Sequence, residues 1–166
     1  MKTVKNTISL AAIIGGLGIC GTATAGTATG SLPVSAIVLE NCTVVSTPLV
    51  FGALTEVGAS DVDSTAVLTL TCTPNADFFV AMDEGVNASS GARRMKNALS
   101  DEFLPYEIYT DNTYATVWGS TEGTDTVAGT APLGVATLTA YGRIDEGVSS
   151  VSAGTYADTV TITVNF

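Results

Sequence analysis

Three pairs of adjacent carboxylates are the residues whose type best suits chemistry: Asp83-Glu84, Asp101-Glu102 and Asp145-Glu146. Two carboxylates on either side of a glycosidic bond can serve as general acid and as base or nucleophile, so a carbohydrate-active enzyme is one hypothesis. All three pairs lie in predicted turns, where carboxylates are solvated and keep ordinary pKa values. Histidine, the usual general base, is absent from the sequence. We therefore expect no catalytic residue.

Residues that could hold a metal or a cofactor are also sparse. Asp61 and Asp63 lack the remainder of a calcium-binding loop. No glycine-rich loop follows a strand and opens a helix, as a phosphate-binding loop would. Cys42 and Cys72 have no further ligands around them for a metal site. We expect no metal and no cofactor.

The first residues predict export. A basic start with Lys2 and Lys5 precedes an apolar run from Ile8 to Ile19 and a small-residue exit at residues 23–25. This pattern is typical of a secretory signal peptide, here residues 1–25, and the apolar run is too short to span a membrane. Removal of this segment leaves 141 of the 166 residues, enough for one domain with a core.

Cysteine usage in the mature chain agrees with an oxidising compartment. Cys20 leaves with the signal peptide, so Cys42 and Cys72 remain as an even pair. We predict that they form one disulfide, which closes a loop of about 30 residues and stabilises the fold by about 3–4 kcal/mol.

The mature chain is strongly acidic. It keeps four of the six lysine and arginine residues and all sixteen acidic residues, so its formal net charge is −12. Such a surface repels nucleic acid and anionic lipid, so we expect neither nucleic-acid binding nor membrane insertion. The run Arg93-Arg94-Met95-Lys96 could be a basic patch for an anionic partner, but we expect these cations to pair with the protein's own carboxylates.

The last residues of the chain form the clearest strand pattern. Val160, Ile162, Val164 and Phe166 alternate with Thr159, Thr161, Thr163 and Asn165, so one face is apolar. No lysine, proline or inward charge guards the outer edge of this strand. We expect the open edge to pair with another strand.

A second alternating segment lies just after the signal peptide. Its apolar face carries Leu32, Val34, Ala36 and Val38, and Pro33 places it at a strand start or a sheet edge. It could also be the first strand of the domain's own sheet. A slip of one residue would exchange this face for the one with Ile37 and Leu39, so the register stays open.

Between these two segments the pattern predicts short strands and no amphipathic helix. Residues 58–64 and 120–134 are expected to be loops. The expected strands are residues 42–45, 49–52, 66–72, 78–82, 103–109, 116–119 and 135–144. Many short strands separated by turns indicate an all-β sandwich of immunoglobulin-like size.

Several ordered motifs resemble the spore coat protein U domain family, which includes the pilin subunits of archaic chaperone-usher pili. The motifs cover essentially the whole mature chain and are Cys42-Thr43-Val44, Leu70-Thr71-Cys72-Thr73, Arg93-Arg94-Met95, Tyr106-Glu107-Ile108-Tyr109-Thr110-Asp111, Val117-Trp118-Gly119, Tyr141-Gly142-Arg143-Ile144 and residues 154–164.

The resemblance implies an incomplete immunoglobulin-like β-sandwich that is completed by a donated strand. It implies that a periplasmic pilus chaperone first lends this strand, and that at the outer-membrane usher the N-terminal extension of a neighbouring pilin subunit replaces it. The donor strand would then use Leu32, Val34, Ala36 and Val38. The acceptor groove and chaperone contact would use Val160, Ile162, Val164 and Phe166.

These expectations define three segments and two main functions. We expect a signal peptide at 1–25, an N-terminal extension or donor strand at 26–40, and a pilin domain at 41–166. The first hypothesis is a non-enzymatic structural subunit of an extracellular chaperone-usher pilus, exported through the periplasm and serving adhesion and biofilm formation. The alternative is a self-contained secreted coat or surface-binding module, with residues 31–39 filling its own groove.

Overall fold

The computed structural model describes residues 25–149 and 151–166, so nearly all of the predicted signal peptide lies outside the described residues. The chain divides into two units, residues 1–36 and 37–166. Residues 25–36 have no regular secondary structure and are exposed. In the part of the chain that is described, we find no helix with the length and hydropathy needed to cross a membrane.

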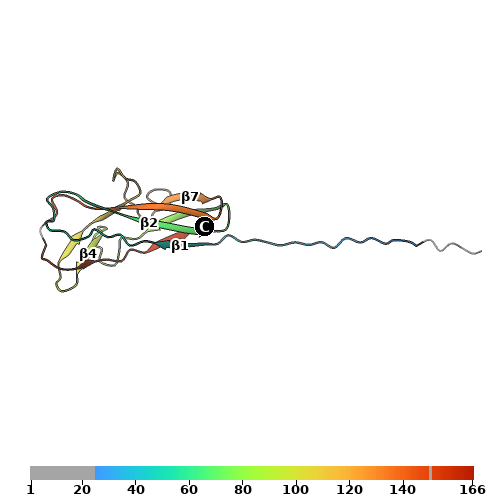
Figure 1. Ribbon diagram of the computed structural model, residues 1–166, viewed down its shortest axis with the longest axis horizontal. Coiled ribbons are helices and arrows are strands. Elements are labelled where there is room, and N and C mark those ends of the chain that lie inside the picture. The colour runs from blue at the N-terminus through green and yellow to red at the C-terminus, as the bar shows by residue number, and fades with distance from the viewer. Residues whose placement is uncertain (1–24, 150) are drawn as a thin grey trace, which may run out of the picture. The chain divides into compact units, whose positions relative to one another are not determined.

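The unit of residues 37–166 is built from strands that pair only in the antiparallel sense (Figure 1). One sheet has the order β1 (Cys42–Ser46), β2 (Val62–Cys72), β8 (Val135–Ile144), β6 (Glu107–Tyr109). The second has the order β10 (Ile162–Asn165), β3 (Ala76–Met82), β7 (Val127–Ala131). A third, smaller sheet has the order β5 (Phe103–Pro105), β4 (Arg94–Asn97), β9 (Tyr156–Ala157).

The core lies between the sheets and is supplied by alternate residues of the long strands. Leu68 and Leu70 of β2, Val80 of β3 and Ile144 of β8 are fully buried. Trp118 is also fully buried, and its indole N–H donates to the carbonyl of Val80 at 2.8 Å, so its one polar atom is satisfied. This arrangement confirms the predicted all-β, immunoglobulin-like sandwich.

The disulfide is present where it was predicted. Cys42 opens β1 and Cys72 ends β2, and the two are direct cross-strand neighbours with Cα atoms 4.0 Å apart. They occupy a non-hydrogen-bonded position, because the next pair is bonded through Thr73 N–H and the carbonyl of Asn41. The disulfide therefore links β1, an edge strand, to β2, its neighbour in the sheet.

Residues 103–109 form two strands and not one. β5 pairs with β4 in the small sheet, whereas β6 pairs with β8 in the first sheet. The change falls at Tyr106, whose N–H donates to the carbonyl of Arg93. Strands that pass from one sheet to another bend in this way at the corners of sandwiches.

Other sequence predictions are wrong in detail. Residues 49–52 form no strand, and β2 begins at Val62 inside the expected loop. β7 falls in the expected loop 120–134; its pattern is weak because Gly129 lies under the ring of Phe78, 2.7 Å from where a Cβ would be. Residues 116–119 form no strand and only an isolated bridge at Val117. β4 contains Arg94, Met95 and Lys96 of the basic run and was not predicted as a strand.

Candidate functional site

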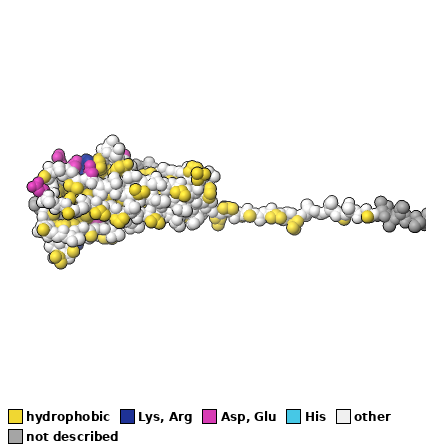
Figure 2. All heavy atoms as spheres, viewed as in Figure 1, with side chains coloured by type: hydrophobic (Ala, Val, Ile, Leu, Met, Phe, Trp, Pro, Cys, Tyr) yellow, Lys and Arg dark blue, Asp and Glu magenta, His cyan; other side chains and the backbone are white. Residues whose placement is uncertain are grey.

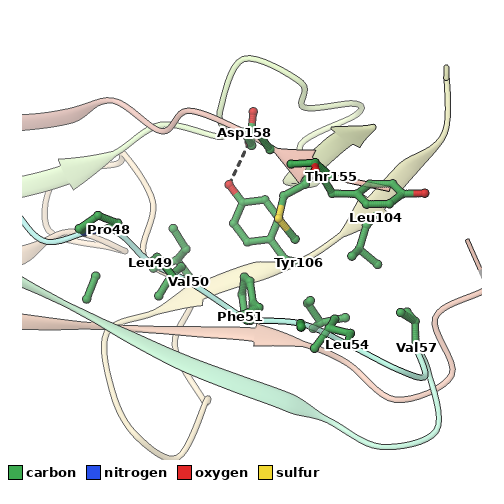
Figure 3. A pocket seen from close by; sticks show the side chains of 18 of the residues that line it. Pro48, Leu49, Val50, Phe51, Leu54, Val57, Leu104, Tyr106, Thr155 and Asp158 are labelled. Atoms are coloured by element: carbon green, nitrogen blue, oxygen red, sulfur yellow. Dashed lines mark hydrogen bonds between the residues drawn. The ribbon is translucent and has the colours of Figure 1, made fainter. Parts of the chain in front are cut away.

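An apolar cleft of about 1220 Å³ opens on the unit of residues 37–166. One wall is formed by residues 46–59 and the other by residues 151–158 with Val160 and Ile162. Figure 3 shows side chains from Pro48 to Val57 along the first wall, with Leu104 and Tyr106 across from them. Figure 2 shows that hydrophobic side chains are spread over this view of the unit, whereas acidic ones gather at one end.

The floor of the cleft is the core itself. Residues from six strands and the β5–β6 corner reach it, and all but one are buried: Ala66, Leu68, Met82, Leu104, Tyr106, Ile108, Ala140 and Ile144, with the half-buried Met95. Although these floor side chains are shielded from solvent by the walls, a hollow of this size directly above the core is unusual, because protein interiors are close-packed. The cleft therefore marks a place where the packing of the sandwich is incomplete.

The second wall ends in β10, which is the edge strand of its sheet. β10 pairs only with β3, and Asp83 N–H donates to the carbonyl of Thr161 at 3.1 Å. Hydrogen-bonded and non-hydrogen-bonded pairs alternate in an antiparallel ladder. The backbone N–H and C=O groups of Ile162 and Val164 consequently point away from β3, to the open edge.

The first wall continues from β1, the edge strand of the other sheet. Cα atoms of β1 and β10 approach within 8 Å, so the two open edges border one seam. Leu49, Phe51, Leu54 and Val57 pack against the core from this wall. Among the described residues, no backbone N–H of residues 48–57 donates a hydrogen bond, and the carbonyl of Val50 accepts one from Ser64 Oγ at 2.6 Å.

The predicted acceptor residues are divided by the structure. Val160 and Ile162 line the cleft. Val164 packs against the core outside it, and Phe166 is 52% exposed at the end of the chain. The wall at residues 46–59 was not predicted as part of a site. Its signal was a cluster of apolar residues, Leu49, Phe51, Leu54 and Val57, without the period of a strand.

The predicted donor residues lie outside the regular strands. Leu32 and Val34 are each 86% exposed and Val38 is 80% exposed, and residues 25–41 contain no strand. Ala36 is exposed as well. The alternating apolar side chains of this segment are therefore exposed, and the segment pairs with no sheet of the domain.

The carboxylate pairs are tied into turns rather than gathered around a cleft. Partial burial raises the pKa of Asp83, but hydrogen bonds from Thr161 and Gly85 outweigh it and hold the pKa below its usual value. Hydrogen bonds led by that from Ser152 likewise lower the pKa of Glu102. The expectation of ordinary pKa values is wrong for these two, and the shift favours the anion, the opposite of what a general acid requires.

All three cations of the basic run were expected to pair with carboxylates, and two of them do so. Arg93 is 2% exposed and forms an ion pair with Glu107, and Lys96 Nζ lies 2.9 Å from Asp101. The guanidinium of Arg94 stacks over the ring of Phe103 at 4.1 Å. Nothing in this run is left free to form a basic patch.

The acidic residues that suggested calcium are held by an arginine. Arg143 lies 2.8 Å from Asp61 and 2.7 Å from Asp63, and its hydrogen bond lowers the pKa of Asp63. Residues 25–149 and 151–166 contain no group of three or more candidate metal ligands.

Tyr106 is the one titratable side chain in the cleft floor. Its hydroxyl donates to Asp158 Oδ2 at 2.9 Å, the dashed line in Figure 3. Burial, and then this hydrogen bond, raises the pKa of Tyr106, so it remains a neutral donor at any physiological pH. The contact connects the floor to the second wall.

These features define an immunoglobulin-like sandwich with a cleft beside the edge strands of its two larger sheets. Residues 28–163 match the family described as Spore Coat Protein U domain. The match spans most of the sequence, and the chain belongs to this family.

Known proteins that resemble the chain include a bacterial relative and a solved structure. Protein U of Myxococcus xanthus is 33% identical over 115 residues, which are 64% of this chain and 62% of that protein, so the chain spans less than two thirds of the relative. A chain of the CsuC–CsuE chaperone-tip adhesion subunit pre-assembly complex, from archaic chaperone-usher Csu pili of Acinetobacter baumannii, superposes with a TM-score of 0.53. It is 24% identical, over 78% of this chain and 40% of that one, and supports the fold.

Proposed function

We propose that the protein is a non-enzymatic structural subunit of an extracellular chaperone-usher pilus and that the cleft accepts a β-strand from another chain. The observation that carries this proposal is the cleft itself, because its floor is hydrophobic core and one wall ends in an unpaired strand edge. An added strand would satisfy the outward backbone groups of Ile162 and Val164 and cover the core at the same time.

The donor is the N-terminal extension, residues 26–40, of a neighbouring subunit. Leu32, Val34, Ala36 and Val38 enter the cleft, and the alternate residues face solvent. Each leucine or valine contributes about 1.5–3 kcal/mol when fully buried, and each main-chain hydrogen bond adds about 0.5–1.5 kcal/mol. The residues after this extension, 41–166, form the pilin domain.

The arrangement of the ends suits a head-to-tail fibre. Cys42 pairs with Cys72 at the end of β2, and Asn165 pairs with Phe79 near the start of β3, so both lie towards the β2–β3 turn. The cleft begins part of the way along these strands, at Ser46 and Ile162, and extends away from that turn to Val57 and Val151. A donor strand antiparallel to β10 would leave the cleft at that opposite end, and the donor's domain would follow it there. The accepting subunit's own extension leaves before Cys42, at the other end, so the two do not compete for space.

This geometry produces an open polymer. Because the giving and receiving surfaces differ, association need not close into a ring. Only residues 39–41 separate Val38 from Cys42, and four backbone steps span no more than about 14 Å. Successive domains in the fibre therefore lie almost end to end.

Assembly requires partners before the fibre forms. A periplasmic pilus chaperone occupies the cleft first, and exchange for the neighbour's extension takes place at an outer-membrane usher. The resemblance to a chain of a chaperone–subunit pre-assembly complex supports the first of these partners. The finished fibre is exported through the periplasm to the cell surface, where it serves adhesion and biofilm formation.

The test is the behaviour of the purified mature chain, residues 26–166. Size-exclusion chromatography and electron microscopy should show oligomers or fibres, and deletion of residues 26–38 should abolish them. The deleted protein should still bind a peptide of residues 26–40. Fibres formed by the deleted protein would contradict the donor assignment.

A self-contained secreted coat or surface-binding module is the second candidate. The family is described as a spore coat domain, and Protein U of Myxococcus xanthus is 33% identical over the matched residues, which favours this alternative. In this case residues 31–39 would occupy the cleft of their own chain. A stable, monodisperse monomer of residues 26–166 would support this function and exclude the fibre.

A further inference from the structure

The two walls of the cleft are held in different ways. Residues 156–157 pair with β4 as β9, and residues 162–165 pair with β3 as β10. Residues 158–161 lie between these pairings and belong to no strand. Something other than a sheet must keep this part of the wall extended.

The loop of residues 83–87 supplies the missing bonds. Thr161 N–H donates to Asp83 Oδ1 at 2.8 Å, and Val86 N–H donates to the carbonyl of Thr159 at 3.0 Å. Asp158 Oδ1 accepts from the backbone N–H of Asn87 at 3.1 Å and from its side-chain amide at 2.9 Å. Backbone and side-chain groups of this loop, together with the carboxylate of Asp158, thus replace a strand ladder over four residues.

Tyr106 and Gly85 complete the contact. Asp158 Oδ2 accepts from the Tyr106 hydroxyl at 2.9 Å, so both oxygens of one carboxylate are engaged. Gly85 has a φ of +85°, and a Cβ there would lie 2.1 Å from Asp158 Oδ2. Glycine is therefore required both by the backbone conformation and by the approach of the carboxylate. We call Asp83, Gly85, Asn87, Tyr106 and Asp158 the latch.

The latch is anchored to the rest of the domain. Arg93 Nη2 and Nε donate to the carbonyl of Asp83 at 2.7 and 3.0 Å, and Arg94 Nε donates to the carbonyl of Asn87 at 3.1 Å. The opposite wall has no equivalent, because residues 48–57 donate no backbone hydrogen bond to any described residue. One wall is fixed before a strand arrives and the other is held by side-chain packing.

We propose that Asp158, through Asn87 and Tyr106, positions the second wall for strand capture, so that the incoming strand pairs with this wall first and residues 48–57 adjust around it. This inference rests on the proposed function. The carbonyls of Thr159 and Thr161 face the latch, which directs the backbone groups of Val160 and Ile162 to the cleft. Without the latch, strand capture must itself order residues 158–161, and that conformational entropy reduces affinity.

The experiment uses a host chain of residues 26–166 with Ala36→Pro, which weakens the pairing of its own extension. A fluorescent peptide of residues 26–40 is titrated against this host and against Tyr106→Phe and Asp158→Asn made in it. Tyr106→Phe removes one oxygen and Asp158→Asn one charge. Asp77→Asn and Tyr141→Phe are matched controls, because Asp77 bonds Thr130 on β7 and Tyr141 lies outside the cleft.

We expect both latch variants to bind the peptide about tenfold more weakly, the effect of one lost hydrogen bond to a charged group. Amide hydrogen exchange should rise at Val86, Asn87 and Thr161 in the free variant and return to the host's level with peptide bound. Leu68 and Leu70 amides should not change. The controls should match the host in both measurements.

Three results would overturn the inference. Faster exchange at the latch with unchanged peptide affinity would mean that the wall needs no positioning. Faster exchange throughout the core would make the residues generally structural. If the host binds no peptide while amide hydrogen exchange in the latch variants rises as predicted, the proposed function is refuted. The role of the latch in strand capture is then refuted with it.

Discussion

Val160→Asp is the substitution that separates strand capture from folding most clearly. Val160 is half-buried and lines the cleft, whereas Thr163 on β10 is exposed. Because Val160 is only partly buried, the new carboxylate keeps contact with water in the free protein. When a donor strand covers the cleft, the carboxylate must be buried among apolar side chains.

The cost follows from two contributions. Loss of a buried valine removes about 1.5–3 kcal/mol. Neutralising an aspartate with a pKa of about 3.9 at pH 7 costs about 4 kcal/mol, at 1.36 kcal/mol per pH unit. Together they predict a loss of about 5–7 kcal/mol, discounted to about 4 kcal/mol if the cleft remains partly hydrated, which is still about a thousandfold in affinity.

The assay is assembly of residues 26–166 followed by size-exclusion chromatography and electron microscopy. Val160→Asp should form no fibres at pH 7 and should shorten wild-type fibres when mixed with them, because it can lend a strand but not accept one. Val160→Asn and lower pH should restore part of the assembly, since the charge is gone. Thr163→Asp should assemble normally. Equal defects in Val160→Asp and Thr163→Asp would refute the assignment of this wall.

Three further predictions concern the donor, the disulfide and acid. Val34→Asp should block strand donation at pH 7 while Ser35→Asp does not, as sedimentation of assembled protein would show; the reverse outcome would shift the register by one residue. Alanine at both Cys42 and Cys72 should lower the free energy of unfolding by about 3–4 kcal/mol in urea denaturation of the assembled protein, and an unchanged midpoint would contradict this. Because the pKa of Asp83 is lowered in the folded protein, its anion stabilises the fold above about pH 4, and this stabilisation is lost as the pH falls through the folded pKa. The difference in urea midpoint between wild type and Asp83→Asn should therefore shrink from pH 7 to pH 3. A constant difference would exclude the effect.

The fold could be predicted from the sequence wherever one face of a strand is buried and the other is wet. Residues 135–144 have the same bounds as β8, because Leu138, Ala140 and Ile144 alternate with polar residues and pack on the core. The disulfide could also be predicted, since only two cysteines remain after export. These signals are local and need no knowledge of the partner sheet.

β7 and β4 could not be predicted, because tertiary contacts determine them. Gly129 weakens the pattern of β7, yet only glycine leaves room for the ring of Phe78. β4 begins at Arg94, which was expected to pair with a carboxylate, but Arg94 stacks on Phe103 of β5. A side chain that fits a neighbour distant in sequence gives no periodic signal.

The cleft was predicted on one wall only. The alternation of Val160 and Ile162 indicated an apolar strand with an open edge, and both residues line the cleft. Residues 46–59 form the other wall without strand periodicity, and Tyr106 reaches the floor from a corner between two sheets. The latch was not predicted either, because Asp158 is 71 positions from Asn87 and 52 from Tyr106, and the fold alone brings them together.

A structure of the assembled protein would show which chain fills the cleft. A cryo-electron microscopy map of material formed by residues 26–166 should show residues 32–38 of one chain as a strand between β10 and residues 48–57 of the next chain. A map in which the cleft of each domain is filled by residues 31–39 of the same chain would contradict the account.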